Sequence, residues 1–100
     1  MNFTPTRLPA PEQVSPAGAV GEIRPTFTWN AVTSAAKYRV VVELVVNPGV
    51  KLVISDVAGT SVQSPSNLGA GHEYRWTVQA FAADGTEGNW SGYTSFTPQP

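Results

Sequence analysis

Residues 68–81 read LGAGHEYRWTVQAF and decide the fold of this 100-residue chain. The stretch begins with a glycine-rich turn and continues as an alternation of apolar and polar residues. Its apolar positions are Tyr74, Trp76, Val78 and Ala80. A repeat of two residues is typical of a strand with one buried and one exposed face. The stretch therefore predicts a long antiparallel strand that is entered through a tight turn.

Six further strands are predicted around this one, separated by turns rich in glycine and proline. They cover residues 12–15, 24–30, 37–45, 50–56, 61–64 and 90–97. The Asn-Pro-Gly sequence at residues 47–49 predicts a turn, and residues 82–89 predict a polar hairpin loop. No ten-residue window shows the period of an amphipathic helix. This pattern predicts an all-β fold, a seven-stranded antiparallel Greek-key β-sandwich.

Length and composition fit one small domain. A chain of 100 residues buries roughly 65% of its unfolded surface, which is enough for a single core. With no cysteine, that core forms without disulfides. Residues 1–9 predict a proline-rich N-terminal arm, because proline holds the chain extended. The folded domain is expected over residues 10–98.

Charge and hydropathy exclude several classes of partner. Six Lys and Arg residues against seven Asp and Glu residues leave a net charge of -1, so no basic surface is expected to bind nucleic acid. No apolar run approaches the ~20 residues that a membrane-spanning helix needs, so no membrane insertion is expected. The first residues lack the basic and apolar regions of a signal peptide.

The chain resembles a fibronectin type III-like domain, a member of the immunoglobulin-like β-sandwich superfold, over about residues 10 to 98. Trp29 and Tyr38 match the family's core aromatic positions, and Tyr74 follows Leu68 by six residues. In that family the latter two residues form a tyrosine corner, in which the phenol hydrogen-bonds to the upstream backbone. The resemblance implies this fold and this corner. It implies no particular activity, because the fold carries many functions.

We expect no enzyme, no cofactor and no metal site. The only histidine, His72, lies in the turn before the long strand, and catalysis requires a base with an orienting group in a cleft. Asp84 and Glu87 offer oxygen ligands, but their loop lacks the regular carboxylate spacing of a calcium site.

Aromatic and apolar residues at expected exposed positions are better candidates for function, because aromatic rings stack on sugars and anchor protein interfaces. Some lie on the outward side of a strand, and others flank or occupy the polar hairpin. The candidate binding surface comprises Phe81, Asp84, Glu87, Asn89, Trp90, Tyr93, Val41 and Val45.

These features favour a non-enzymatic structural or interaction module that mediates protein–protein contacts or spacing on an extracellular or particle surface. It would be a module of a bacterial secreted or adhesion protein, or a small virion decoration protein. The expected partner is another protein or a neighbouring domain of the same chain, and a homo-oligomer remains open. The alternative is a carbohydrate-binding module that uses Trp90 and Tyr93.

Overall fold

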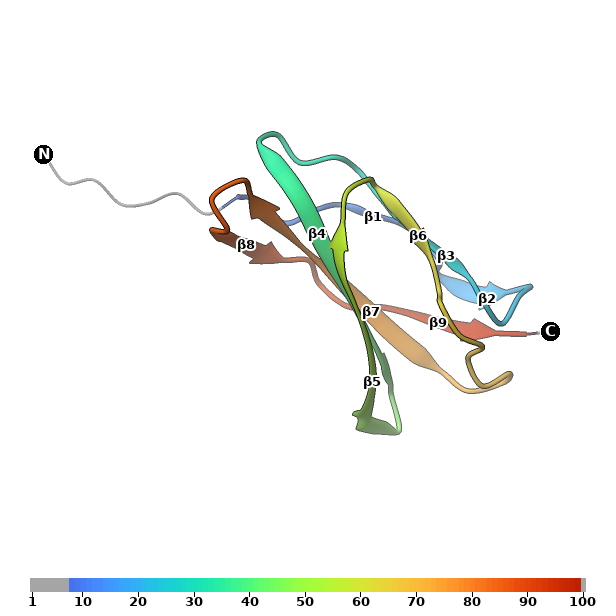
Figure 1. Cartoon of the computed structure of the whole chain (residues 1–100). Helices are drawn as coiled ribbons and strands as arrows, with labels where there is room; N and C mark the ends of the chain where they lie inside the picture. Colours follow the sequence, from blue (N-terminus) through green and yellow to red (C-terminus); the bar gives the residue numbers. More distant parts are fainter. Residues whose placement is uncertain (1–7, 100) are drawn as a thin grey trace, which may run out of the picture.

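The computed structural model describes residues 8–99, which form nine strands in two sheets (Figure 1). The strands are β1 (Gln13–Ser15), β2 (Gly18–Val20), β3 (Thr26–Trp29), β4 (Ala35–Leu44), β5 (Asn47–Val57), β6 (Ser61–Gln63), β7 (Tyr74–Ala82), β8 (Glu87–Trp90) and β9 (Thr94–Pro98). Almost all of the predicted arm, residues 1–9, lies outside the described part of the chain. Within that part, no helix is long and apolar enough to cross a membrane.

The two sheets confirm the predicted all-β sandwich. The first sheet has the order β1-β3-β6, and the second has the order β2-β9-β7-β4-β5, with β8 also pairing with β7. Figure 1 shows the three-stranded sheet running alongside the larger one. The structure differs from the prediction in its nine strands and in one pairing. β2 runs parallel to β9, with Gly18 opposite Phe96.

The core lies between the sheets, and the alternation in the sequence places its residues correctly. The inward side chains of β7 and β4 are buried, and aromatic residues of β3 and β9 pack on them. The ring of Phe27 lies 5.2 Å from that of Trp76, and the ring of Trp29 lies 5.4 Å from that of Tyr38. Tilted ring pairs at this distance add to the stability from burial.

The turn before β7 forms the expected tyrosine corner. The Tyr74 hydroxyl accepts a hydrogen bond from the Gly69 backbone N–H at 2.7 Å. Leu68 packs against the core, and its N–H donates to the Ile23 carbonyl at 2.8 Å. Gly71 adopts a φ of +79°, which glycine tolerates without strain. The connection into β7 is thereby fixed, as the resemblance implied.

We expect Tyr74→Phe to lower the free energy of unfolding by about 1–2 kcal/mol, because the Gly69 N–H loses its partner in a half-buried place. Urea denaturation followed by circular dichroism measures the change. Ser95→Ala is the control: it removes the hydroxyl of an exposed side chain on β9, where water can replace any lost contact. Equal losses in the two variants would contradict a stabilising role for the corner.

The first correction concerns the turn between β4 and β5. Residues 47–49, predicted to form this turn, belong to β5, and the turn consists of residues 45–46. Leu44 already pairs with Asn47, so the chain reverses within two residues. The register shifts between Glu43 and Leu44, so Pro48 and Gly49 have no partner residue on β4. The edge position of β5 tolerates a proline, because one side of the strand has no partner strand.

The second correction concerns residues 82–97, predicted as a hairpin loop (82–89) followed by one strand (90–97). β8 begins inside the predicted loop and ends at Trp90, residues 91–93 belong to no strand, and β9 begins only at Thr94. β8 pairs with one end of β7 and β9 with the other, so the two strands share one edge. Between them, the Ser91 hydroxyl accepts a hydrogen bond from the Val78 N–H at 2.9 Å. In the gap between β8 and β9, a side-chain hydroxyl thus replaces a backbone partner for β7.

Candidate functional site

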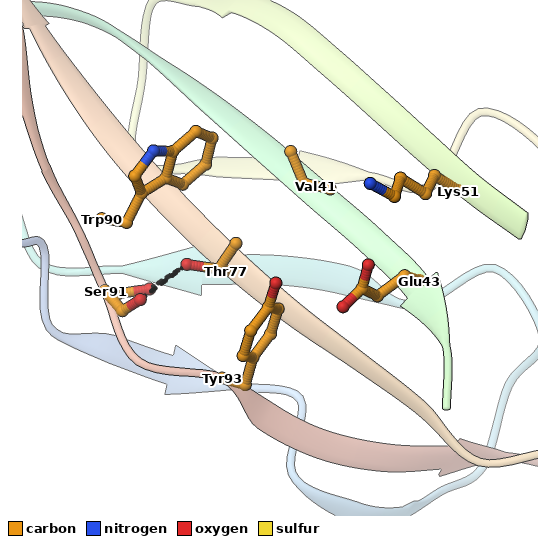
Figure 2. Close-up of a pocket in the computed structure, with 7 residues that line it drawn as sticks. All are labelled: Val41, Glu43, Lys51, Thr77, Trp90, Ser91 and Tyr93. Atoms are coloured by element: carbon orange, nitrogen blue, oxygen red, sulfur yellow. Dashed lines mark hydrogen bonds between the residues drawn. The ribbon is translucent and has the colours of Figure 1, made fainter. Parts of the chain in front are cut away.

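A groove of about 390 Å³ lies on the outer face of the second sheet (Figure 2). Its floor comes from the adjacent strands β4 and β7. Figure 2 shows Trp90 and Tyr93 on one side of this floor and Lys51 of β5 on the other. The lining residues are Val41, Glu43, Lys51, Thr77, Trp90, Ser91 and Tyr93.

The strand register brings the floor together. Val41 of β4 lies opposite Thr77 of β7, and Glu43 lies opposite Arg75. On its other side, Glu43 lies opposite Lys51 of β5. Residues directly opposite each other in a sheet share a face, so all five side chains project from the outer surface.

The break between β8 and β9 forms the aromatic wall. The Thr77 hydroxyl donates to the Ser91 carbonyl at 2.7 Å, which attaches the segment to β7. Trp90 precedes this anchor and is 42% exposed, and Tyr93 follows it and is 55% exposed. Because both flank a bonded segment, their rings are held at the groove instead of moving with a long loop.

An ion pair lies at the edge of the floor. The Glu43 carboxylate is buried and lies 2.7 Å from Nε of Arg75, whose guanidinium stacks 4.2 Å from the centre of the Tyr93 ring. Burial acts to raise the pKa of Glu43, but hydrogen bonds from Arg75 and Tyr93 and the charges of Arg75 and Lys51 outweigh it. The pKa therefore lies below its usual value, and the carboxylate is ionised at neutral pH.

Tyr93 completes this cluster as a hydrogen-bond donor. Desolvation of its phenol, followed by its hydrogen bond to Glu43 and the charge of that carboxylate, raises the pKa of Tyr93. The hydroxyl therefore keeps its proton at neutral pH and donates to Glu43. The groove thus joins two aromatic rings, an ionised carboxylate and the Lys51 ammonium group, and the Arg75 guanidinium lies beside it.

Three of the eight predicted surface residues line the groove: Val41, Trp90 and Tyr93. Phe81 does not, and the expectation that it is exposed was wrong. Its outward direction was correct, but only 8% of it is exposed. The charged groups of Arg39 and Lys37 lie 4.9 Å and 5.9 Å from the centre of its ring, so two long cationic side chains cover it.

The other predicted residues lie outside the groove. Asp84, Glu87 and Asn89 are exposed around the β7–β8 turn, and Val45 lies in the β4–β5 turn. The Asp84 carboxylate accepts a hydrogen bond from the Thr86 N–H at 2.9 Å. Hydrogen bonds from Thr86 also lower the pKa of Asp84. This carboxylate therefore holds a turn together.

The charged and polar members of the site were not predicted from the sequence: Glu43, Arg75, Lys51 and Thr77. A signal was present, because the alternation puts Glu43 on the outward side of its strand together with Val41. Alternation does not say which outward residues of different strands become neighbours. Within residues 8–99, no three histidine, aspartate or glutamate side chains gather into a metal site.

Comparison with known proteins bears on the fold. No protein-family model matches this chain, and no curated protein matches its sequence. A solved structure similar to this one is that of "a Fn3-like protein from Clostridium thermocellum", with a TM-score of 0.71. The two chains share 18% identity over 95% of this chain and 97% of the other. At this identity the likeness concerns architecture alone, and it shows that the chain has a fibronectin type III-like fold.

Proposed function

We propose that this domain is a non-enzymatic interaction module that binds a protein partner through the groove on its outer face. The observation that carries the proposal is the pair of exposed rings, Trp90 and Tyr93, held beside the Glu43–Arg75 ion pair. Tryptophan, tyrosine and arginine are the residue types that most often dominate binding energy at interfaces. Fibronectin type III-like domains are modules often involved in protein interactions, which agrees with this role.

The groove also indicates what the partner brings. Glu43 and Arg75 neutralise each other, so Lys51 leaves one positive charge at the opposite wall. A partner with an apolar or aromatic side chain for Trp90 and an acidic group for Lys51 complements both walls. We place this interaction on an extracellular or particle surface, in a bacterial adhesion or secreted protein or a virion decoration protein. A neighbouring domain of the same chain would meet the same chemical requirements.

Carbohydrate binding is the second candidate, and a different observation favours it. Two rings for stacking lie within one groove with a carboxylate, an ammonium group and hydroxyl groups, which are the hydrogen-bonding groups that sugar hydroxyls need. The volume of about 390 Å³ lies within the range of small-ligand sites, roughly 300–1,000 Å³.

We expect Trp90→Ala and Tyr93→Ala each to weaken partner binding by at least about tenfold. Trp90→Ala is expected to leave the melting temperature nearly unchanged, and Tyr93→Ala to lower it modestly, because Glu43 loses a hydrogen-bond donor. The partner is captured from the source organism on the wild-type domain, purified, and titrated against each variant by calorimetry. Val14→Ala is the control, because Val14 is exposed on β1 of the other sheet. Unchanged affinity in both aromatic variants would exclude the groove as the binding site.

A glycan array separates the two candidates. Carbohydrate binding requires that the wild-type domain retain a defined glycan and that Trp90→Ala and Tyr93→Ala lose it. A protein interaction requires a stoichiometric complex with the purified partner and no specific glycan signal. In both cases the variants keep the wild-type circular dichroism spectrum, because both rings are substantially exposed.

A further inference from the structure

β5 presents a long sheet edge. It is the terminal strand of the second sheet and spans 11 residues, whereas the terminal strands β1, β2 and β6 span three residues each. Between the described residues, no backbone hydrogen bond joins β5 to any segment other than β4. An edge of this kind presents N–H and C=O groups that another strand can pair with.

The middle of this edge is regular and partly apolar. Residues 51–54 pair without interruption with residues 40–43 of β4. Register irregularities lie on both sides of this segment, and Asp56 adopts a φ of 59°. Such irregularities bend a strand locally, so the segment between them is the regular part of this edge. Val53, in the regular part, is 53% exposed on the outer face, next to Val41.

The charges of β5 are complementary to those of a second copy. Its two charged residues, Lys51 and Asp56, lie on opposite sides of Val53. Both project from the outer face: Lys51 is opposite Glu43, and Asp56 is 2.8 Å from Lys37. With a two-fold axis at Val53, residue 51 of one strand lies opposite residue 55 of the other, so Lys51 lies one residue away from the second copy's Asp56, which also pairs with Lys37 of its own chain. No like charges then lie opposite each other.

We propose that β5 pairs antiparallel with β5 of a second copy of this chain, with the two-fold axis at Val53. The pairing joins the two larger sheets into one and leaves both outer faces on the same side. The two grooves then face one direction, so the dimer is bivalent toward a surface that repeats its partner. A single strand pair buries little area, so the dimer is expected to be weak and dependent on concentration. The inference extends the proposed function without depending on what the groove binds.

The test compares Val53→Lys with Val14→Lys by analytical ultracentrifugation of the full chain from about 10 μM to about 1 mM, a range that reaches weak association. Val14 is a matched control: it is 58% exposed and lies on β1, an edge strand of the other sheet. We expect the wild-type mass to rise from 10.6 kDa toward twice that value. Val53→Lys is expected to dimerise at least about tenfold more weakly, because two lysines meet at the axis, and Val14→Lys is expected to dimerise like the wild type.

A mixture of two variants tests the axis itself. Val53→Lys and Val53→Glu alone are each expected to dimerise at least about tenfold more weakly than the wild type, and their equimolar mixture is expected to associate more strongly than either variant alone, because lysine then faces glutamate. A wild-type protein that is monomeric at about 1 mM would overturn the proposal. Equal weakening by Val14→Lys, or a mixture that fails to associate while both variants keep the native circular dichroism spectrum, would also overturn it. None of these results depends on partner binding at Trp90, so the dimer proposal and the binding-groove proposal are tested separately.

Discussion

Trp76→Ala is expected to lower the free energy of unfolding by about 3–5 kcal/mol, the range for truncating a buried large side chain. Trp76 is fully buried, with its ring 5.2 Å from that of Phe27 and 6.4 Å from that of Trp29. Its indole N–H donates to the Pro16 carbonyl at 3.0 Å, so the substitution also leaves that carbonyl without its partner. A small domain has about 5–15 kcal/mol of stability in total, so this loss is a large part of it.

Trp90→Ala is the matched control, because it makes the same chemical change on a side chain that is substantially exposed. It is expected to cost less than about 1 kcal/mol. Both losses are measured by urea denaturation, with circular dichroism as the signal because tryptophan fluorescence changes in both variants. Similar losses would mean that Trp90 belongs to the core, and the proposed binding site would lose its principal residue.

Gly88→Ala is expected to cost about 1–3 kcal/mol and to weaken partner binding as well. A Cβ atom at this position would lie 2.8 Å from the Ala80 carbonyl oxygen and 3.1 Å from the Leu8 carbonyl oxygen. Both contacts are with backbone, so a rotamer change of a neighbouring side chain cannot relieve them. β8 has to move away from β7, and it carries Trp90 with it.

Gly92→Ala is the control for this effect. It lies just after β8, in the connection between Trp90 and Tyr93, and its Cβ would meet no atom within 4 Å. We expect it to keep the wild-type stability. Urea denaturation and calorimetric titration of the purified partner give the two readouts. A Gly88→Ala variant as stable as Gly92→Ala would show that β8 packs less closely on β7 than the structure indicates.

The proposed groove and the proposed dimer edge lie next to each other on the second sheet. The groove lies between the aromatic wall and β5, and the dimer axis lies on β5. Lys51 belongs to both, as part of the groove wall and as the positive end of the edge. Val53 does not line the groove, which is why its charge variants separate dimer formation from partner binding.

The sequence by itself determined the sandwich, its core and the tyrosine corner. The reason is that these features depend on local patterns. A repeat of two residues sorts Trp76 and Val78 to the buried face whatever strand lies beside them. The tyrosine corner was implied by the resemblance to fibronectin type III-like domains, and it is a local feature as well, because the Tyr74 hydroxyl bonds to backbone only five residues upstream.

The tertiary structure alone decided which residues form the proposed binding face. Phe81 and Trp90 are both aromatic residues near one hairpin, yet side chains of β4 cover the first and leave the second exposed. The pairing of Glu43 with Arg75 and the place of β5 at the sheet edge follow from the register of β4 with its two neighbours. The register between strands, and the covering of one side chain by others, depend on contacts between segments distant in the sequence. The alternation within one strand contains no information about these contacts.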